Sequence, residues 1–170
     1  TVVVTAQDGV TSSTVSIAWP IDPKPQTAAP APSHDSANVI SVYSDDFADN
    51  INTNLNPGWG QATQASEVQI AGNNTLEYAN LNYQGMELTQ TDVSAMEYVH
   101  FDYYTDDATS LKLSLISPAT PNPLENAYVI RNSTGSWRSV DIPLTAYTVP
   151  ELDKIFQLKT EGNGTIWIDN

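Results

Sequence analysis

The sequence has no cysteine among its 170 residues. Thiolate catalysis, cysteine-based zinc sites and thiol redox chemistry are therefore excluded. Disulfide bonds, which commonly reinforce small secreted domains, are excluded as well. Any reinforcement beyond the hydrophobic core has to come from a bound metal.

Basic residues are scarce. Six Lys and Arg stand against twenty Asp and Glu, which gives a formal net charge of −14, and none of the six lies between Lys24 and Lys112. Because nucleic-acid binding depends on basic side chains that neutralise phosphates, this charge argues against nucleic acids and anionic lipid surfaces as partners. No stretch approaches the roughly 20 apolar residues of a membrane span. Neutral ligands and cations remain as possible binding partners.

The composition divides the chain into three parts. Residues 1–19 hold two β-patterned runs around an Asp-Gly turn, and an isolated hairpin of this kind is marginal in water. We interpret it as the terminal hairpin of a preceding immunoglobulin-like domain; docking on the main domain is the alternative. Residues 20–37 contain PIDPKPQTAAPAP and are typical of a semi-rigid Pro-rich linker. Residues 38–170 form the main module.

The main module consists of short strand patterns, from VISVY at 39–43 to GTIWID at 164–169. Most alternate apolar and polar residues, as half-buried strands do, and turn signals such as AGNN and EGNG separate them. About ten short strands without a persistent helical period are typical of an all-β, antiparallel β-sandwich. A jelly roll is the expected topology.

The acidic residues raise the possibility of a glycoside hydrolase, which uses two carboxylates at the scissile bond. The candidates occupy polar positions of alternating patterns, which is also typical of a solvated sheet face: Glu67, Glu77, Glu87 and Glu97. The connections are short, and GxSxG, HExxH and P-loop motifs are absent. Catalysis is therefore the weaker alternative.

Two acidic segments suggest a metal site. YSDDFADN begins at Tyr43 and contributes Asp45 and Asp46, and WIDN at the end contributes Asp169. Hard oxygen ligands of this kind suit calcium. In a jelly roll the first and last strands can lie side by side, so Asp45 and Asp169 could meet. Solvated acidic turns are the alternative.

Two aromatic residues stand in similar local sequences. Trp59 lies in LNPGWGQAT and Tyr83 in LNYQGMEL, each close to a glutamine and a glycine. An aromatic plane can stack on a pyranose ring, amides can bind its hydroxyls, and glycine lets the backbone approach closely. A lid over the core is the alternative role for Trp59. A rival sugar site would lie on a sheet face that carries His100, Asp102 and Tyr104.

Several ordered blocks over residues 38–170 resemble the carbohydrate-binding modules of Bacteroidota laminarinases and surface glycan-binding proteins. The blocks are SVYSDDFADN, LNPGWGQAT, LNYQGMEL, VSAMEYVHFDYYTDDATSLKLSLISP, GSWRSVDIPLTAY and IFQLKTEGNGTIWIDN. The resemblance implies a jelly-roll β-sandwich, a structural calcium ion, no catalysis and binding of a β-linked glucan.

The resemblance also implies functional residues. Sugar contacts are expected first from Trp59, Gln61, Tyr83 and Gln84, and second from Trp137 and Arg131. Calcium ligands are expected from Asp45 and Asp169, with Asp46 second. Modules of this kind continue past the IDN block with a further apolar strand, so we expect the last strand and the calcium shell to be incomplete at Asn170.

The sequence thus predicts a monomeric, non-catalytic module of a multi-domain cell-surface protein that binds a neutral β-glucan, with laminarin, a β-1,3-glucan, as the expected ligand. An extracellular location at the outer membrane, or secretion, follows from the resemblance. The alternatives are a module appended to a secreted glycoside hydrolase, a small β-sandwich hydrolase or lyase, and a spacer or adhesion domain.

Overall fold

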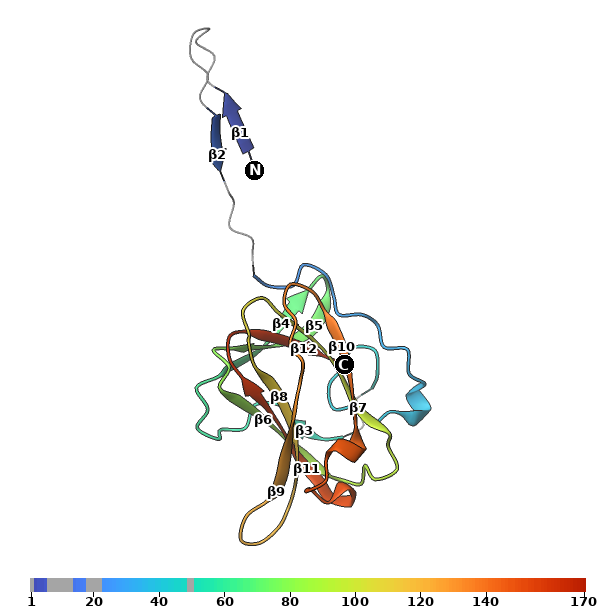
Figure 1. The fold of residues 1–170 in the computed structure, drawn as a ribbon. Helices are drawn as coiled ribbons and strands as arrows, with labels where there is room; N and C mark the ends of the chain where they lie inside the picture. The colour runs from blue at the N-terminus through green and yellow to red at the C-terminus, as the bar shows by residue number, and fades with distance from the viewer. Residues whose placement is uncertain (1, 6–13, 18–22, 49–50) are drawn as a thin grey trace.

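The computed structural model describes residues 2–5, 14–17, 23–48 and 51–170 (Figure 1). Strands β1 (Val2–Thr5) and β2 (Thr14–Ile17) pair antiparallel as a separate two-stranded sheet. The paired strands expected near the start of the chain are therefore present, and the origin of this hairpin in an immunoglobulin-like domain stays a prediction. Trp19 lies outside the described residues.

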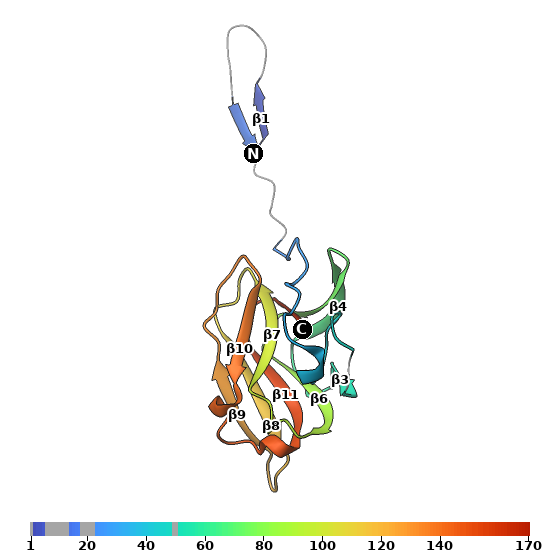
Figure 2. The ribbon, with the colours of Figure 1, turned by 90° about the vertical axis from the view of Figure 1, so that its right-hand side faces the viewer.

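Two five-stranded antiparallel sheets form the body (Figures 1 and 2). The β7 sheet has the order β10-β7-β12-β5-β4, and its strands are β10 (Arg138–Pro143), β7 (Tyr98–Thr105), β12 (Ile166–Asp169), β5 (Asn73–Ala79) and β4 (Gln64–Ile70). The β6 sheet has the order β3-β6-β11-β8-β9, and its strands are β3 (Thr53–Asn54), β6 (Tyr83–Thr91), β11 (Ile155–Gly162), β8 (Leu111–Ser117) and β9 (Leu124–Val129). The chain crosses repeatedly between the sheets, as in a jelly roll.

The core lies between the two sheets. Alternate side chains of the strands point inward, and the largest fully buried ones include Tyr78, Tyr103, Leu111, Leu115 and Ile142. This arrangement confirms the predicted antiparallel β-sandwich.

The prediction of a strand at 39–43 is wrong, because this segment pairs with no strand of either sheet. Side-chain hydrogen bonds hold the chain just after it instead. Ser44 Oγ donates to Asn170 Oδ1 at 2.8 Å, and Asp45 accepts two hydrogen bonds from Asn74. An apolar, alternating pattern therefore lies beside the sandwich without joining a sheet.

Helical structure in the described residues is limited to the short 3₁₀ turns η1 (Ser36–Asn38), η2 (Leu144–Ala146) and η3 (Leu152–Lys154). The last of these lies within PELDKIF at residues 150–156. Across the described ranges, no helix has the length and apolar character needed to cross a membrane.

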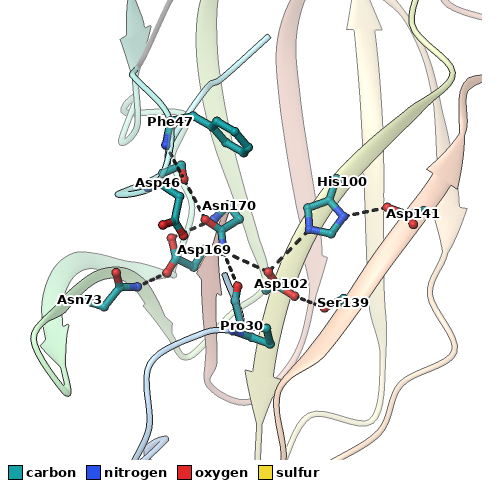
Figure 3. A network of polar contacts seen from close by, with 11 residues as sticks. Pro30, Asp46, Phe47, Asn73, His100, Asp102, Ser139, Asp141, Asp169 and Asn170 are labelled. Atoms are coloured by element: carbon teal, nitrogen blue, oxygen red, sulfur yellow. Dashed lines mark hydrogen bonds and ion pairs between the residues drawn. The ribbon is translucent and has the colours of Figure 1, made fainter. Parts of the chain in front are cut away.

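Part of the Pro-rich stretch packs on the sandwich. Pro25 is buried. Trp137 Nε1 donates a hydrogen bond to the Thr27 carbonyl at 2.8 Å, and Asn170 Nδ2 donates one to the Pro30 carbonyl at 3.1 Å (Figure 3). This segment therefore lies against the module, while the boundary of the linker at residue 37 stays a prediction.

Candidate functional site

Trp59 lies face-on against strand β6. A Cβ atom at Gly85 would overlap three neighbouring carbons of the indole, Cζ3, Cε3 and Cη2. Because the three carbons are almost equally close to that position, the six-membered ring lies flat over the glycine. The opposite face of the ring points away from the sheet, and the side chain as a whole is half-buried.

Polar contacts fix the position of this ring. Trp59 Nε1 donates to Glu87 Oε1 at 2.9 Å, two residues along β6 from the glycine. The Trp59 amide donates to Gln61 Oε1, and Tyr83 Oη donates to the Trp59 carbonyl, each at 2.8 Å. Gly60 has a φ of +79°, which favours glycine. The loop therefore presents a pre-positioned aromatic surface on the outer face of the β6 sheet.

The two glutamines predicted to contact sugar have internal partners. Gln84 is 0% exposed, and its Nε2 donates to the carbonyls of Gly85 at 3.0 Å and Leu55 at 3.4 Å. Gln61 Nε2 donates to the Pro57 carbonyl at 2.7 Å and to Gln84 Oε1 at 3.3 Å. The structure places Gln84 on the inner face of β6, out of reach of a sugar. Both amides hold the loop that carries the tryptophan.

Polar groups surround the ring on the same sheet face, because directly opposite residues of an antiparallel pair share a face. On β11, Lys159 lies opposite Gly85, Gln157 opposite Glu87 and Glu161 opposite Tyr83. Lys159 Nζ lies 3.5 Å from Glu161 Oε2 and 2.6 Å from a carboxylate oxygen of Glu125. Sequence reasoning missed these β11 residues, although their spacing of two in IFQLKTEG could have placed them on one face.

Trp137 belongs to the other side of the sandwich. It precedes β10 in the β7 sheet, and its ring meets Tyr104 edge-on with centroids 6.0 Å apart. Tyr104 in turn meets Trp167 at 5.8 Å. The outer faces of the two sheets point in opposite directions, so Trp137 and Trp59 do not share a site.

Arg131 also lies apart from the tryptophan loop. It is exposed in the connection that follows β9, the edge strand of the β6 sheet. Strands β11 and β8 separate β9 from β6, which carries the ring of Trp59. The structure therefore brings together Trp59, Gln61, Tyr83 and Gln84, and neither Trp137 nor Arg131 joins them.

The rival surface, which carries His100, Asp102 and Tyr104, is the outer face of the β7 sheet. We call residues 25–34 the covering segment, because they cross this face and make the contacts of Thr27 and Pro30 described above. Asp102 and Trp167 are only 1% and 4% exposed there. A sugar could reach this face only by displacing the covering segment, which favours the Trp59 surface.

The expected calcium ligands lie near two neighbouring asparagines. Asp169 is 1% exposed, and burial raises its pKa to about 6. Asn73 Nδ2 donates to Asp169, while Asn74 donates to Asp45 from its backbone N at 2.7 Å and its Nδ2 at 2.9 Å. Asp46 is exposed. The carboxylate oxygens of Asp45, Asp46 and Asp169 are hard ligands of the kind that calcium prefers. The asparagine contacts to Asp45 and Asp169 come from N–H groups, and ligation itself stays a prediction.

A cavity of about 820 Å³ lies between the sheets. It reaches into the core, and its walls include the apolar side chains of Leu76, Met86, Phe101, Leu115 and Ile168. Polar side chains line it as well, among them Glu97, Lys112 and Thr160.

The two-sheet fold is similar to that of solved carbohydrate-binding modules. The family 11 carbohydrate-binding module of Clostridium thermocellum, solved with a β-1,3-1,4-mixed-linked tetrasaccharide, has a TM-score of 0.50 and 15% identity, covering 75% of this chain and 89% of its own. The family 11 module of a cellulosomal cellulase from the same organism has a TM-score of 0.51 and 15% sequence identity, and the match covers 76% of this chain and 89% of that module. At this identity the likeness shows a common fold. No family model and no curated protein matches the chain.

Proposed function

We propose that residues 38–170 are a non-catalytic carbohydrate-binding module whose ligand stacks on Trp59. The observation that carries this proposal is the position of the indole. One face of the ring lies on Gly85, and the other points away from the sheet. A single glycine and one hydrogen bond to Glu87 fix it there before any ligand arrives.

The neighbouring groups suit a sugar. A pyranose ring placed on the indole would have the polar ends of Gln157, Lys159 and Glu161 along β11 within the same sheet face. These side chains both donate and accept hydrogen bonds, as sugar hydroxyls require. By analogy with the stacking of nucleobases on aromatic side chains, the tryptophan would contribute about 1–3 kcal/mol.

A neutral β-glucan is the proposed ligand class, with laminarin-like β-1,3-glucan first. The net charge of −14 supports an uncharged polymer. The mixed-linked tetrasaccharide bound by the family 11 module supports a β-glucan. The laminarin assignment rests on the sequence resemblance alone.

The proposed setting is a multi-domain protein at the cell surface, in which the module acts as a monomeric unit and holds glucan outside the cell. The N-terminal hairpin and the Pro-rich stretch support a multi-domain chain. A module attached to a secreted glycoside hydrolase would have the same binding surface. Further, we propose that Asp45 and Asp169 bind a structural calcium ion. Their carboxylate oxygens are ligands that suit this ion, and hydrogen bonds from Asn73 and Asn74 hold the two side chains in place.

Calorimetry with laminarin, mixed-linkage β-glucan and cello-oligosaccharides tests this proposal. Trp59→Ala is expected to abolish or strongly weaken binding. Trp137→Ala is the matched control, because it removes the same side chain from the opposite sheet and is expected to leave affinity unchanged. Equal binding by Trp59→Ala and wild type would refute the site. Release of reducing sugar from any of these glucans would refute the non-catalytic assignment.

A further inference from the structure

The two histidines of the sequence meet on the outer face of the β7 sheet. His34 ends the covering segment, and His100 lies on β7, with ring centroids 4.8 Å apart. Asp141 on β10 lies opposite His100, and its Oδ1 is 2.7 Å from His100 Nδ1 (Figure 3). One ligand atom from each of these three residues lies within 4.8 Å of the others. In the described ranges, no other group of three His, Cys, Asp or Glu side chains gathers in this way.

The other ring nitrogen of His100 faces a buried carboxylate. Nε2 is buried without a hydrogen-bond partner, and Asp102 Oδ2 lies 3.6 Å away, beyond hydrogen-bonding distance. Asp102 is 1% exposed and accepts hydrogen bonds from Ser139 Oγ and Asn170 Nδ2. Each ring nitrogen of His100 therefore faces a carboxylate.

This arrangement has the parts of a carboxylate–histidine–metal site. A histidine that binds a metal through one nitrogen usually donates its other N–H to a carboxylate, which fixes the orientation of the ring. Here Nδ1 faces Asp141, while Nε2 faces Asp102. Imidazole nitrogens suit zinc and similar transition metals, whereas calcium takes oxygen ligands.

We propose that His34, His100 and Asp141 bind a zinc-type divalent cation, with Asp102 orienting His100. Three protein ligands and one water would complete the four positions that zinc prefers. The site lies apart from the Trp59 surface and does not depend on sugar binding. Because His34 belongs to the covering segment and the other two ligands belong to the β7 sheet, the ion would clamp the Pro-rich segment onto the module.

Calorimetric titration of the full chain with Zn²⁺, at mildly alkaline pH and without a polyhistidine tag, tests the site. The expected result is one saturable site per chain. His34→Ala should abolish it, and because this residue lies outside the strands, the variant should keep the fold, which circular dichroism would confirm. Asp102→Asn should weaken zinc binding by about 10- to 100-fold, the usual effect of losing the carboxylate behind a ligating histidine. Asp153→Asn, which changes an exposed carboxylate elsewhere, is the control.

Hydrogen exchange of the covering segment supplies a second readout. Zinc should slow exchange of amides in residues 26–34 in the wild type and leave it unchanged in His34→Ala. Absence of saturable zinc binding by the wild type would overturn the proposal. His100 would then have a structural role alone, through its contacts with Asp102 and Asp141. Equal zinc affinity in His34→Ala and the wild type would overturn it as well.

Discussion

Replacing Gly85 with alanine perturbs the proposed site without removing any polar or aromatic group. The added Cβ would overlap three carbons of the Trp59 ring, so the indole has to move off strand β6. The shift would break the 2.9 Å hydrogen bond from Nε1 to Glu87. Overpacking of this kind typically costs about 1–3 kcal/mol of stability.

The effect on sugar affinity follows from the loss of the stacking surface. If stacking on Trp59 contributes about 1–3 kcal/mol, its displacement should weaken binding by about 5- to 150-fold, since about 1.4 kcal/mol corresponds to tenfold. Isothermal titration calorimetry with laminarin measures this change directly. Denaturant unfolding of the same variant separates the loss of affinity from the loss of stability.

Gly58→Ala is the matched control for this experiment. Gly58 lies in the same loop, one residue before Trp59, and a Cβ there would meet nothing within 4 Å. The laminarin affinity and the stability of the Gly58→Ala variant should stay close to those of the wild type. Wild-type affinity in Gly85→Ala would refute the reasoning, because the ring could not then be the binding surface in the position that the structure gives it.

Further predictions concern the support of the site and its metal. Tyr83→Phe removes the hydrogen bond to the Trp59 carbonyl, and since such a bond contributes about 0.5–1.5 kcal/mol, laminarin affinity should fall about 2- to 10-fold in calorimetry; an unchanged affinity would mean that this bond does not hold the loop. Gln84→Ala leaves buried carbonyls without their donor and should lower the free energy of unfolding by about 1–3 kcal/mol in urea, a loss that would be absent if the amide acted only on ligand. Calcium at a hundredfold excess over its Kd should stabilise chelator-treated protein by about 2.7 kcal/mol, which raises Tm by about 5–10 °C. Asp45→Asn should remove this shift in scanning calorimetry, and an equal shift in that variant would exclude Asp45 as a ligand.

The sandwich could be predicted from the sequence because its strands alternate so regularly. In EYVHFDYYT, Phe101 and Tyr103 lie two residues apart and both are buried in the core. In IFQLKTEG the period holds from Gln157 onward, after an irregularity in the register between Ile155 and Gln157. VISVY shows the limit of this signal. It has the composition of a strand, but a strand also needs a free ladder partner, and side-chain hydrogen bonds hold the chain beside it instead.

The grouping of the site residues could be predicted only in part. The shared pattern of aromatic, amide and glycine brought Trp59, Gln61, Tyr83 and Gln84 together, and they do meet. The pattern of residue types does not tell which way Gln84 points. The strand geometry does, because neighbouring residues of a strand point to opposite faces and Tyr83 points outward. The coverage of the β7 sheet could not be predicted either, because a Pro-rich run has no period that indicates what it packs against.

The central claim is that sugar binds over Trp59 and away from the opposite sheet face. The chain has four tryptophans, so the indole N–H signals in a ¹⁵N–¹H spectrum report separately on each surface while a β-1,3-gluco-oligosaccharide is added. The account predicts a progressive, saturable shift of the Trp59 signal, with the Trp137 and Trp167 signals unchanged. A shift of the Trp137 signal with a stationary Trp59 signal would contradict it.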